Sequence, residues 1–159
     1  MFMHGGWLHV IGNMLYLYIF GDNVEDTLGH GRYLLFYFLC GVASFLVQIL
    51  FQSHSMVPNV GASGAIAGVL GAYILLFPRA RVVTLLPIFI FFTVVEIPAY
   101  IFLGIWFLIQ FFSGALTLGR ASAQSGGVAW WAHIGGFVVG MLLLKVMGPR
   151  DSARRPVVV

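Results

Sequence analysis

Long apolar runs, separated by short polar segments, fill the chain almost from end to end. They cover roughly residues 7–20, 33–51, 62–77, 82–118 and 128–147. A helix needs about 20 residues to cross the hydrocarbon core of a bilayer, which is about 30 Å thick. The second and fifth runs reach that length. The first and third are shorter, which predicts helices that begin below the membrane surface and face a cavity.

The fourth run is too long for one span and contains Pro87, Glu96 and Pro98. These residues predict an amphipathic or irregular lead-in, followed by a spanning helix over residues 98–112. Proline suits a helix start because the N–H that it lacks has no helical partner there. The pattern predicts an all-α fold: a polytopic transmembrane helix bundle over residues 1–148, with about five spans, and a short basic tail over residues 149–159.

Composition supports a membrane protein. The chain is 60% hydrophobic and 8% charged, with a mean hydropathy of +0.99, whereas about 25% of the residues of a soluble domain are charged. Cys40 is the single cysteine, so the chain forms no internal disulfide and no thiolate metal cluster. The net charge of +3 reflects membrane sidedness, and we expect the lipid bilayer, not nucleic acid, as a partner.

The placement of the basic residues predicts the orientation. Of the 8 Lys and Arg residues, all but Arg120 fall in connections on one side of the membrane: Arg32, Arg79, Arg81, Lys145, Arg150, Arg154 and Arg155. The positive-inside rule therefore puts the C-terminus in the cytoplasm and Met1 outside. A chain of this kind calls for one more span before Met1, and we expect about six in the complete protein.

Polar side chains fall at similar depths near the outer ends of three runs. His9 and Asn13 share one face of the first helix, and His4 lies about one turn further out. Ser63 begins the third run, and His133 lies one to two turns inside the fifth. Polar groups in hydrocarbon are costly, so they indicate function and call for a partner. We expect these groups to be partners of one another.

Together these residues supply the parts for acyl transfer by a serine. Ser63 is a nucleophile, His133 a base and Asn13 an amide that stabilises an anion. Each also has an ordinary explanation when taken singly. A membrane serine commonly bonds to a backbone carbonyl, an interior histidine satisfies a neighbouring helix, and an asparagine joins helices.

A transporter or a haem-binding protein that uses His4, His9 and His133 is another interpretation. A spacing of five residues places His4 and His9 on different faces of a helix, which makes them a poor pair of ligands. The sequence has no His-Glu-x-x-His zinc pattern. We therefore expect chemistry that needs no metal and no cofactor.

Two glycine pairs flank the proposed nucleophile and base. Gly64 and Gly68 follow Ser63, and Gly136 and Gly140 lie on the face that carries His133. Small residues spaced four apart let helix backbones approach closely. This approach would bring a serine hydroxyl within hydrogen-bond reach of an imidazole, although plain helix packing also explains the pairs.

Four segments resemble the rhomboid intramembrane serine proteases in order and spacing. They read HGGWLHVIGN over residues 4–13, GASG over residues 61–64 and AHIGGFVVG over residues 132–140. The fourth, over residues 21–29, is similar to the loop after the family's second span, where a Gly-xxx-Glu-xxx-Gly pattern that includes Glu25 holds the helix end. The family's first span and the Trp-Arg pair of its outer loop are missing from this chain.

The resemblance implies that Ser63 is the nucleophile and His133 its base, with no carboxylate partner. It implies an oxyanion hole made of His9, Asn13 and the Ser63 backbone N–H. His4, Gly61 and the glycines named above would support that site. Trp130 and Trp131 would stack on the imidazole or lie at the membrane interface. Aromatic residues of the fourth run would flank substrate entry or serve as packing residues: Phe102, Trp106 and Phe107.

The implied activity is endoproteolysis of single-span transmembrane proteins near the outer membrane boundary, in a prokaryotic plasma membrane. One alternative is a rhomboid-like protein that binds transmembrane clients without cutting them. Such relatives typically lose the serine or the histidine, and this chain retains Ser63 and His133. Another alternative is an inactive fragment of the protease.

Overall fold

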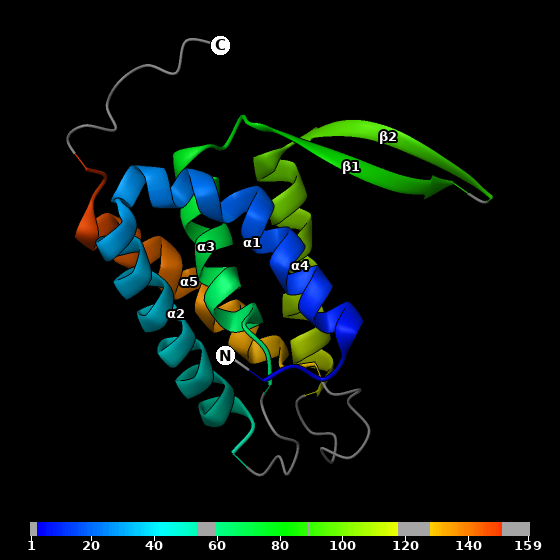
Figure 1. Cartoon of the computed structure of the whole chain (residues 1–159). Helices are drawn as coiled ribbons and strands as arrows, with labels where there is room; N and C mark the ends of the chain where they lie inside the picture. Colours follow the sequence, from blue (N-terminus) through cyan, green and yellow to red (C-terminus); the bar gives the residue numbers. More distant parts are fainter. Residues whose placement is uncertain (1–2, 54–59, 89, 118–127, 151–159) are drawn as a thin grey trace.

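A computed structural model describes residues 3–53, 60–88, 90–117 and 128–150. Its elements, in chain order, are α1 (Trp7–Leu28), α2 (His30–Phe51), α3 (Ser63–Leu76), β1 (Arg81–Ile88), β2 (Phe91–Pro98), α4 (Ala99–Thr117) and α5 (Trp130–Met147) (Figure 1). The predicted helical bundle is confirmed. A two-stranded hairpin between α3 and α4 is added to it.

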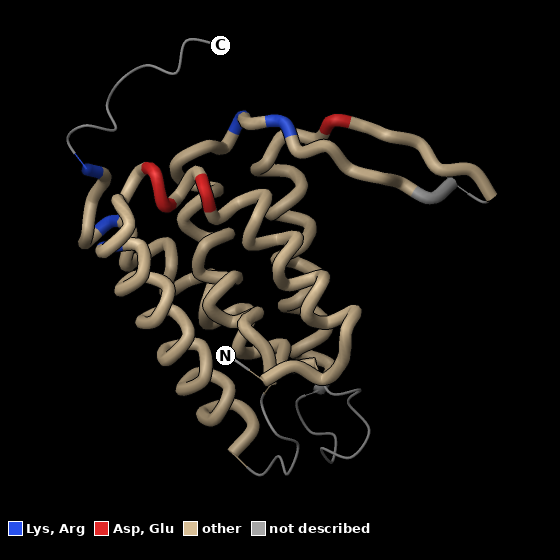
Figure 2. The backbone as a smooth tube through the Cα atoms, in the orientation of Figure 1, with Lys and Arg blue, Asp and Glu red and all other residues tan. Residues whose placement is uncertain are grey.

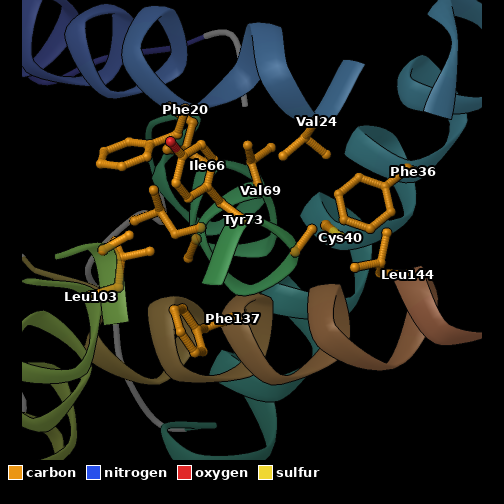
Figure 3. Close-up of a cluster of buried hydrophobic side chains, with 14 of the residues drawn as sticks. Phe20, Val24, Phe36, Cys40, Ile66, Val69, Tyr73, Leu103, Phe137 and Leu144 are labelled. Atoms are coloured by element: carbon orange, nitrogen blue, oxygen red, sulfur yellow. The ribbon is translucent and has the colours of Figure 1, made fainter. Parts of the chain in front are cut away.

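Helix α3 lies at the centre of the bundle and contacts α1, α2, α4 and α5 (Figure 1). Ten of its 14 residues are buried. Side chains from all five helices converge on the core: Phe20, Val24, Phe36, Cys40, Ile66, Val69, Tyr73, Leu103, Phe137 and Leu144 (Figure 3). The buried position of α3 fixes Ser63, its first residue, against the neighbouring helices.

Glycines set the distance between α3 and α5. A Cβ on Gly136 would collide with the carbonyl oxygen of Gly64, and one on Gly140 with that of Gly68. The two glycine pairs therefore pack against each other, backbone to backbone. Helices that lack these methyl groups approach closely enough for short side chains to meet.

The bundle has the surface of a membrane protein. Within the described residues, α2, α4 and α5 are long and apolar enough to cross a bilayer, whereas α3 is shorter, as its apolar run predicted. Large apolar side chains point outward, among them Leu50 at 78% exposure and Val146 at 83%. Figure 2 shows that the charged residues of the described chain gather at one end of the bundle. This separation fits helices that span lipid.

The expectation of a loop over residues 21–29 is wrong, because α1 continues to Leu28. No proline interrupts this polar stretch, and the helix ends only at Gly29, whose φ of 81° suits glycine. The Gly29 N–H donates to the Glu25 carbonyl oxygen at 2.6 Å. The Glu25 side chain does not hold the helix end in this way, because its carboxylate lies 2.6 Å from His30 Nδ1.

The irregular lead-in expected before the fourth helix is a regular antiparallel hairpin. Its register runs from Arg81 opposite Pro98 to Ile88 opposite Phe91. Valine and threonine favour strands over helices, and both strands are rich in them. Helix α4 begins directly after Pro98, as predicted, and extends beyond the expected end at residue 112 to Thr117.

The charged end is held together by contacts between distant segments. The Arg32 guanidinium donates to the carbonyl oxygens of Met147 and Gly148, which ties the start of α2 to the end of α5. The Arg150 N–H donates to the Thr27 carbonyl at 2.9 Å. Arg120 and the basic tail from residue 151 onward lie outside the described residues.

Candidate active site

Ser63 is the first residue of α3 and lies at the end of the bundle opposite the charged residues (Figures 1 and 2). Gly61 precedes it with a φ of 108°, a region that side-chain-bearing residues rarely adopt. Because the first N–H groups of a helix have no partner within it, the Ser63 N–H is available to other acceptors. The bend at Gly61 is thus followed directly by a residue that offers both a hydroxyl and an N–H.

His133 meets Ser63 from the neighbouring helix α5. Its Nε2 lies 2.8 Å from the Ser63 Oγ, although 70 positions separate the residues in sequence. The close packing of the glycine pairs directly beyond both residues allows this short contact. A hydrogen bond between nucleophile and base is the geometry that activates a serine hydroxyl.

The second nitrogen of His133 contacts a residue that the sequence analysis did not select. The Gln110 Oε1 of α4 lies 2.7 Å from His133 Nδ1, and Gln110 is only 7% exposed. A carbonyl oxygen can only accept, so Nδ1 carries the proton and Nε2 is left as an acceptor for the Ser63 hydroxyl. A lone amide within an apolar spanning run is the signal that could have identified this residue from the sequence.

Asn13 supplies an unused donor beside the serine. It is 7% exposed, and its Nδ2 has no hydrogen-bond partner among the residues that the structure describes. The same nitrogen would lie 3.5 Å from a Cβ placed on Gly61. Buried amides are almost always paired, so an open one beside Ser63 points to a bound acceptor.

His9 lies next to Asn13 and faces the same glycine. Its Nδ1 accepts a hydrogen bond from the Gly5 N–H at 3.3 Å. The neutral ring therefore carries its proton on Nε2, the atom that would lie 2.7 Å from a Cβ on Gly61. Asn13 and His9 thus turn two donors toward the segment that leads into Ser63.

One cavity of about 770 Å³ connects these groups. His9, Asn13, Ser63 and His133 line it together, alongside Trp106 of α4. The volume falls within the range of ordinary ligand sites. The structure therefore brings residues from α1, α3 and α5 to one pocket.

His4 does not lie on a helix face, contrary to expectation, because α1 begins only at Trp7. Its ring packs edge-on against His9 with 5.3 Å between centroids. The spacing of five residues does not separate the two rings, since the backbone before Trp7 is not helical. Glu25 lies near the other end of α1, where its carboxylate contacts His30, and it is not among the residues that line the pocket.

Three tryptophans surround the site in different ways. Trp106 and Trp130 approach the His133 ring, with centroid separations of 5.9 Å and 6.4 Å. Trp131 stacks on Phe51 at 4.0 Å instead, so the expectation that it supports the imidazole is wrong. Trp131 follows Trp130 directly and therefore points to a different side of α5.

The other two aromatics of α4 that the sequence analysis named pack inward. Phe102 lies against Phe20, and Phe107 lies against Phe137, with centroids 6.2 Å and 4.9 Å apart. These contacts agree with the packing role. A role in substrate entry stays a prediction.

Gln48 of α2 is a second buried amide that the sequence analysis missed. Its Oε1 accepts a hydrogen bond from the Ala132 N–H at 3.0 Å, while its Nε2 donates to the Gln52 side chain at 2.7 Å. The Ala132 N–H belongs to the first turn of α5 and has no partner within the helix. Gln48 thereby anchors α5 one residue before His133.

Comparisons with known proteins point to one family. The family model for the Rhomboid domain matches residues 1–150. Rhomboid protein 1, mitochondrial, of Saccharomyces cerevisiae is 29% identical over 146 residues, covering 89% of this chain and 38% of that protein. The zebrafish (Danio rerio) presenilin-associated rhomboid-like protein A, mitochondrial, is 32% identical over 126 residues, covering 76% and 33%.

A bacterial relative covers a shorter stretch. Rhomboid protease GluP of Bacillus subtilis is 40% identical over 70 residues, which is 44% of this chain and 13% of that protein. The chain therefore spans well under half the length of these relatives. No solved structure matches it significantly. The family model covers nearly the whole chain, and the chain belongs to the rhomboid family.

Proposed function

We propose that the protein is an intramembrane serine endopeptidase that cleaves transmembrane protein substrates with Ser63 and His133. The observation that carries the proposal is the 2.8 Å contact between Ser63 Oγ and His133 Nε2. Gln110 supports it, because its oxygen at 2.7 Å keeps the Nδ1 proton in place and leaves Nε2 free to act as a base.

The reaction follows from these contacts. His133 Nε2 takes the proton of the Ser63 hydroxyl as Ser63 Oγ attacks the carbonyl carbon of the scissile bond. The protonated imidazole then returns that proton to the leaving amine, and an acyl-enzyme ester remains on Ser63. A water, deprotonated by His133 in turn, attacks the ester. The bond to Ser63 Oγ then breaks, Ser63 Oγ takes the proton back from His133, and the acid product leaves. Gln110 holds the imidazole throughout and exchanges no proton.

The oxyanion of each tetrahedral intermediate needs donors close to Ser63. We assign this role to Asn13 Nδ2, His9 Nε2–H and the Ser63 backbone N–H. The lack of a described partner for Asn13 Nδ2 supports the assignment, as does the shared cavity that Asn13, His9 and Ser63 line. Donors that are fixed before the reaction stabilise developing charge without reorganisation, and each contributes about 3–4 kcal/mol in serine proteases.

The position of the pocket supports an orientation and a class of substrate. The described basic residues gather at the end of the bundle away from Ser63 (Figure 2). Under the positive-inside rule that end faces the cytoplasm, and Ser63 lies near the outer boundary. We propose a prokaryotic plasma membrane as the location and single-span proteins as substrates, cut where the helix unwinds near that boundary.

Reconstitution in vesicles with a single-span model substrate tests the proposal. We expect cleavage by the chain with its natural residues and none by the Ser63→Ala variant, with the cut site mapped by mass spectrometry. Ser113→Ala on α4 serves as a matched control, because it removes a hydroxyl that no assigned step uses. Equal turnover by the Ser63→Ala variant would exclude Ser63 as the nucleophile.

A fluorophosphonate probe distinguishes the protease from a client-binding relative. The probe reacts only with an activated serine, so we expect labelling that requires both Ser63 and His133. Binding of the model substrate without labelling and without cleavage would favour the non-proteolytic alternative. Absence of labelling in a folded chain that also fails to bind would favour the inactive fragment.

A further inference from the structure

The β1–β2 hairpin exposes an apolar face that the bundle does not cover. The register places Val83, Leu85, Phe92 and Val94 on one side of the two strands. Their exposures are 66%, 59%, 70% and 64%. We call these four side chains the apolar face of the hairpin. Ile90 and Phe91 at its tip are even more exposed, at 83% and 71%.

The opposite side of the hairpin is mixed. It carries both threonines of the strands, Thr84 and Thr93, beside the apolar Leu86 and Phe91, while Val82 is buried against the bundle. The two sides thus differ in that the hydroxyls of the strands lie on one face only, whereas the described side chains on the outer part of the other face are apolar. A contiguous exposed apolar surface of this kind marks a site that contacts lipid or protein. A two-stranded hairpin alone is only marginally stable in water.

The position of the hairpin favours lipid. Figure 1 shows it projecting sideways from the bundle, across the direction of the helices and at the end where the charges gather (Figures 1 and 2). Its second strand leads directly into α4, whose own outward side chains are apolar, among them Tyr100 at 51% and Ile105 at 53% exposure. The apolar face therefore continues the surface by which a spanning helix contacts the bilayer.

The charges at its base agree with a position at the headgroups. Arg79 and Arg81 are exposed there, and Arg81 forms an ion pair of 3.2 Å with Glu96, on side chains that are 73% and 54% exposed. Exposed arginines beside an apolar surface suit the boundary between acyl chains and anionic headgroups.

The backbone sets the depth and disfavours a protein partner. Both strands have one open edge, and unpaired N–H and C=O groups are not tolerated in the hydrocarbon core. Pro87 and Pro98 each remove an N–H from a strand, and prolines on an edge disfavour pairing with a further strand. We propose that the hairpin is an interfacial membrane anchor, which lies on the leaflet at the charged end with its apolar face against the acyl chains.

Spin labels test this proposal independently of any catalysis. The single cysteine is replaced (Cys40→Ala), and a nitroxide is attached at Phe92→Cys on the apolar face or at Thr93→Cys on the opposite face. Leu108→Cys on α4, where Leu108 is 52% exposed, reports on lipid, and Arg79→Cys reports on water. Collision with oxygen and with a nickel chelate is measured in vesicles of phosphatidylcholine with phosphatidylglycerol.

The label at residue 92 should favour oxygen over nickel nearly as strongly as the label at residue 108. The label at residue 93 should resemble the one at residue 79. Val94→Cys is a second reporter on the apolar face. Labels at residues 92 and 94 that are as open to nickel as residue 79 would overturn the proposal. Spin–spin broadening at residue 92 that disappears on dilution with lipid would overturn it as well, in favour of a second copy of the chain.

Discussion

The Gln110 Oε1 lies 2.7 Å from His133 Nδ1, on the side of the ring opposite Ser63. In soluble serine proteases an aspartate holds this nitrogen and stabilises the imidazolium. A neutral amide fixes the same tautomer without placing a second charge in a low-dielectric interior. Such a partner avoids the desolvation penalty of a buried carboxylate. In the proposed mechanism Gln110 is thus a positioning residue that acts through His133.

Replacing Gln110 by leucine should lower kcat about tenfold, since a net hydrogen bond contributes about 1–1.5 kcal/mol. The KM should change little, because Gln110 does not line the cavity that Ser63 and His133 share. Gln110→Glu keeps an acceptor and should retain more activity than the leucine variant. Initial rates at several substrate concentrations in vesicles separate the two constants. An unchanged kcat for the leucine variant would contradict the positioning role.

Asn13→Ala should reduce kcat by about 10²- to 10³-fold, the effect of losing one oxyanion donor. It should not lower the unfolding temperature, because the Asn13 Nδ2 has no described partner to lose and an unpaired buried group opposes folding. Asn23→Ala on the same helix, whose Nδ2 donates to Ile19 at the charged end, is the matched control for activity. Unfolding temperature and turnover are measured on the same preparation. A loss of both together would indicate a structural role for Asn13.

Much of this arrangement could be predicted from sequence because the membrane simplifies it. Apolar runs give the helices, and basic residues indicate which ends lie together. The distance of each residue from the outer end of its helix then predicts that His9, Asn13, Ser63 and His133 lie at a similar depth. The cavity that they share agrees with that prediction. The spacing of Gly64, Gly68, Gly136 and Gly140 indicated which helices touch.

Other features depend on packing that periodicity does not encode. Gln110 lies four residues beyond Trp106, in an apolar run where the sequence analysis selects only aromatic residues as candidates. The sequence predicts an irregular lead-in in place of the hairpin, because the strands lack a strict alternation of polar and apolar residues, which is the usual signal for a strand. The sequence predicts too early an end for α1, because the polar residues near Glu25 resemble a loop. In the structure these residues are helical.

The glycine contacts between α3 and α5 predict a pair of opposite effects. Gly136→Ala should destabilise the fold by about 1–3 kcal/mol, as overpacking does, because its methyl group would meet the Gly64 carbonyl oxygen. Gly104→Ala on α4 has open space and should be neutral or stabilise by up to about 1 kcal/mol through helix propensity. Thermal unfolding in detergent compares them. Equal stability of the two variants would rule out close backbone packing at Gly136.

Gly61 and His9 should be coupled in activity. A methyl group on Gly61 would lie 2.7 Å from His9 Nε2 and would displace the ring, while the φ of 108° adds strain of about 1–3 kcal/mol. Gly61→Ala should therefore lower kcat/KM at least as much as His9→Ala. In the double variant the clash is gone and only the strain remains. Its loss of kcat/KM, expressed as a free energy, should therefore be smaller than the sum of the losses in the two single variants. Strict additivity across this double-mutant cycle would mean that Gly61 does not position His9.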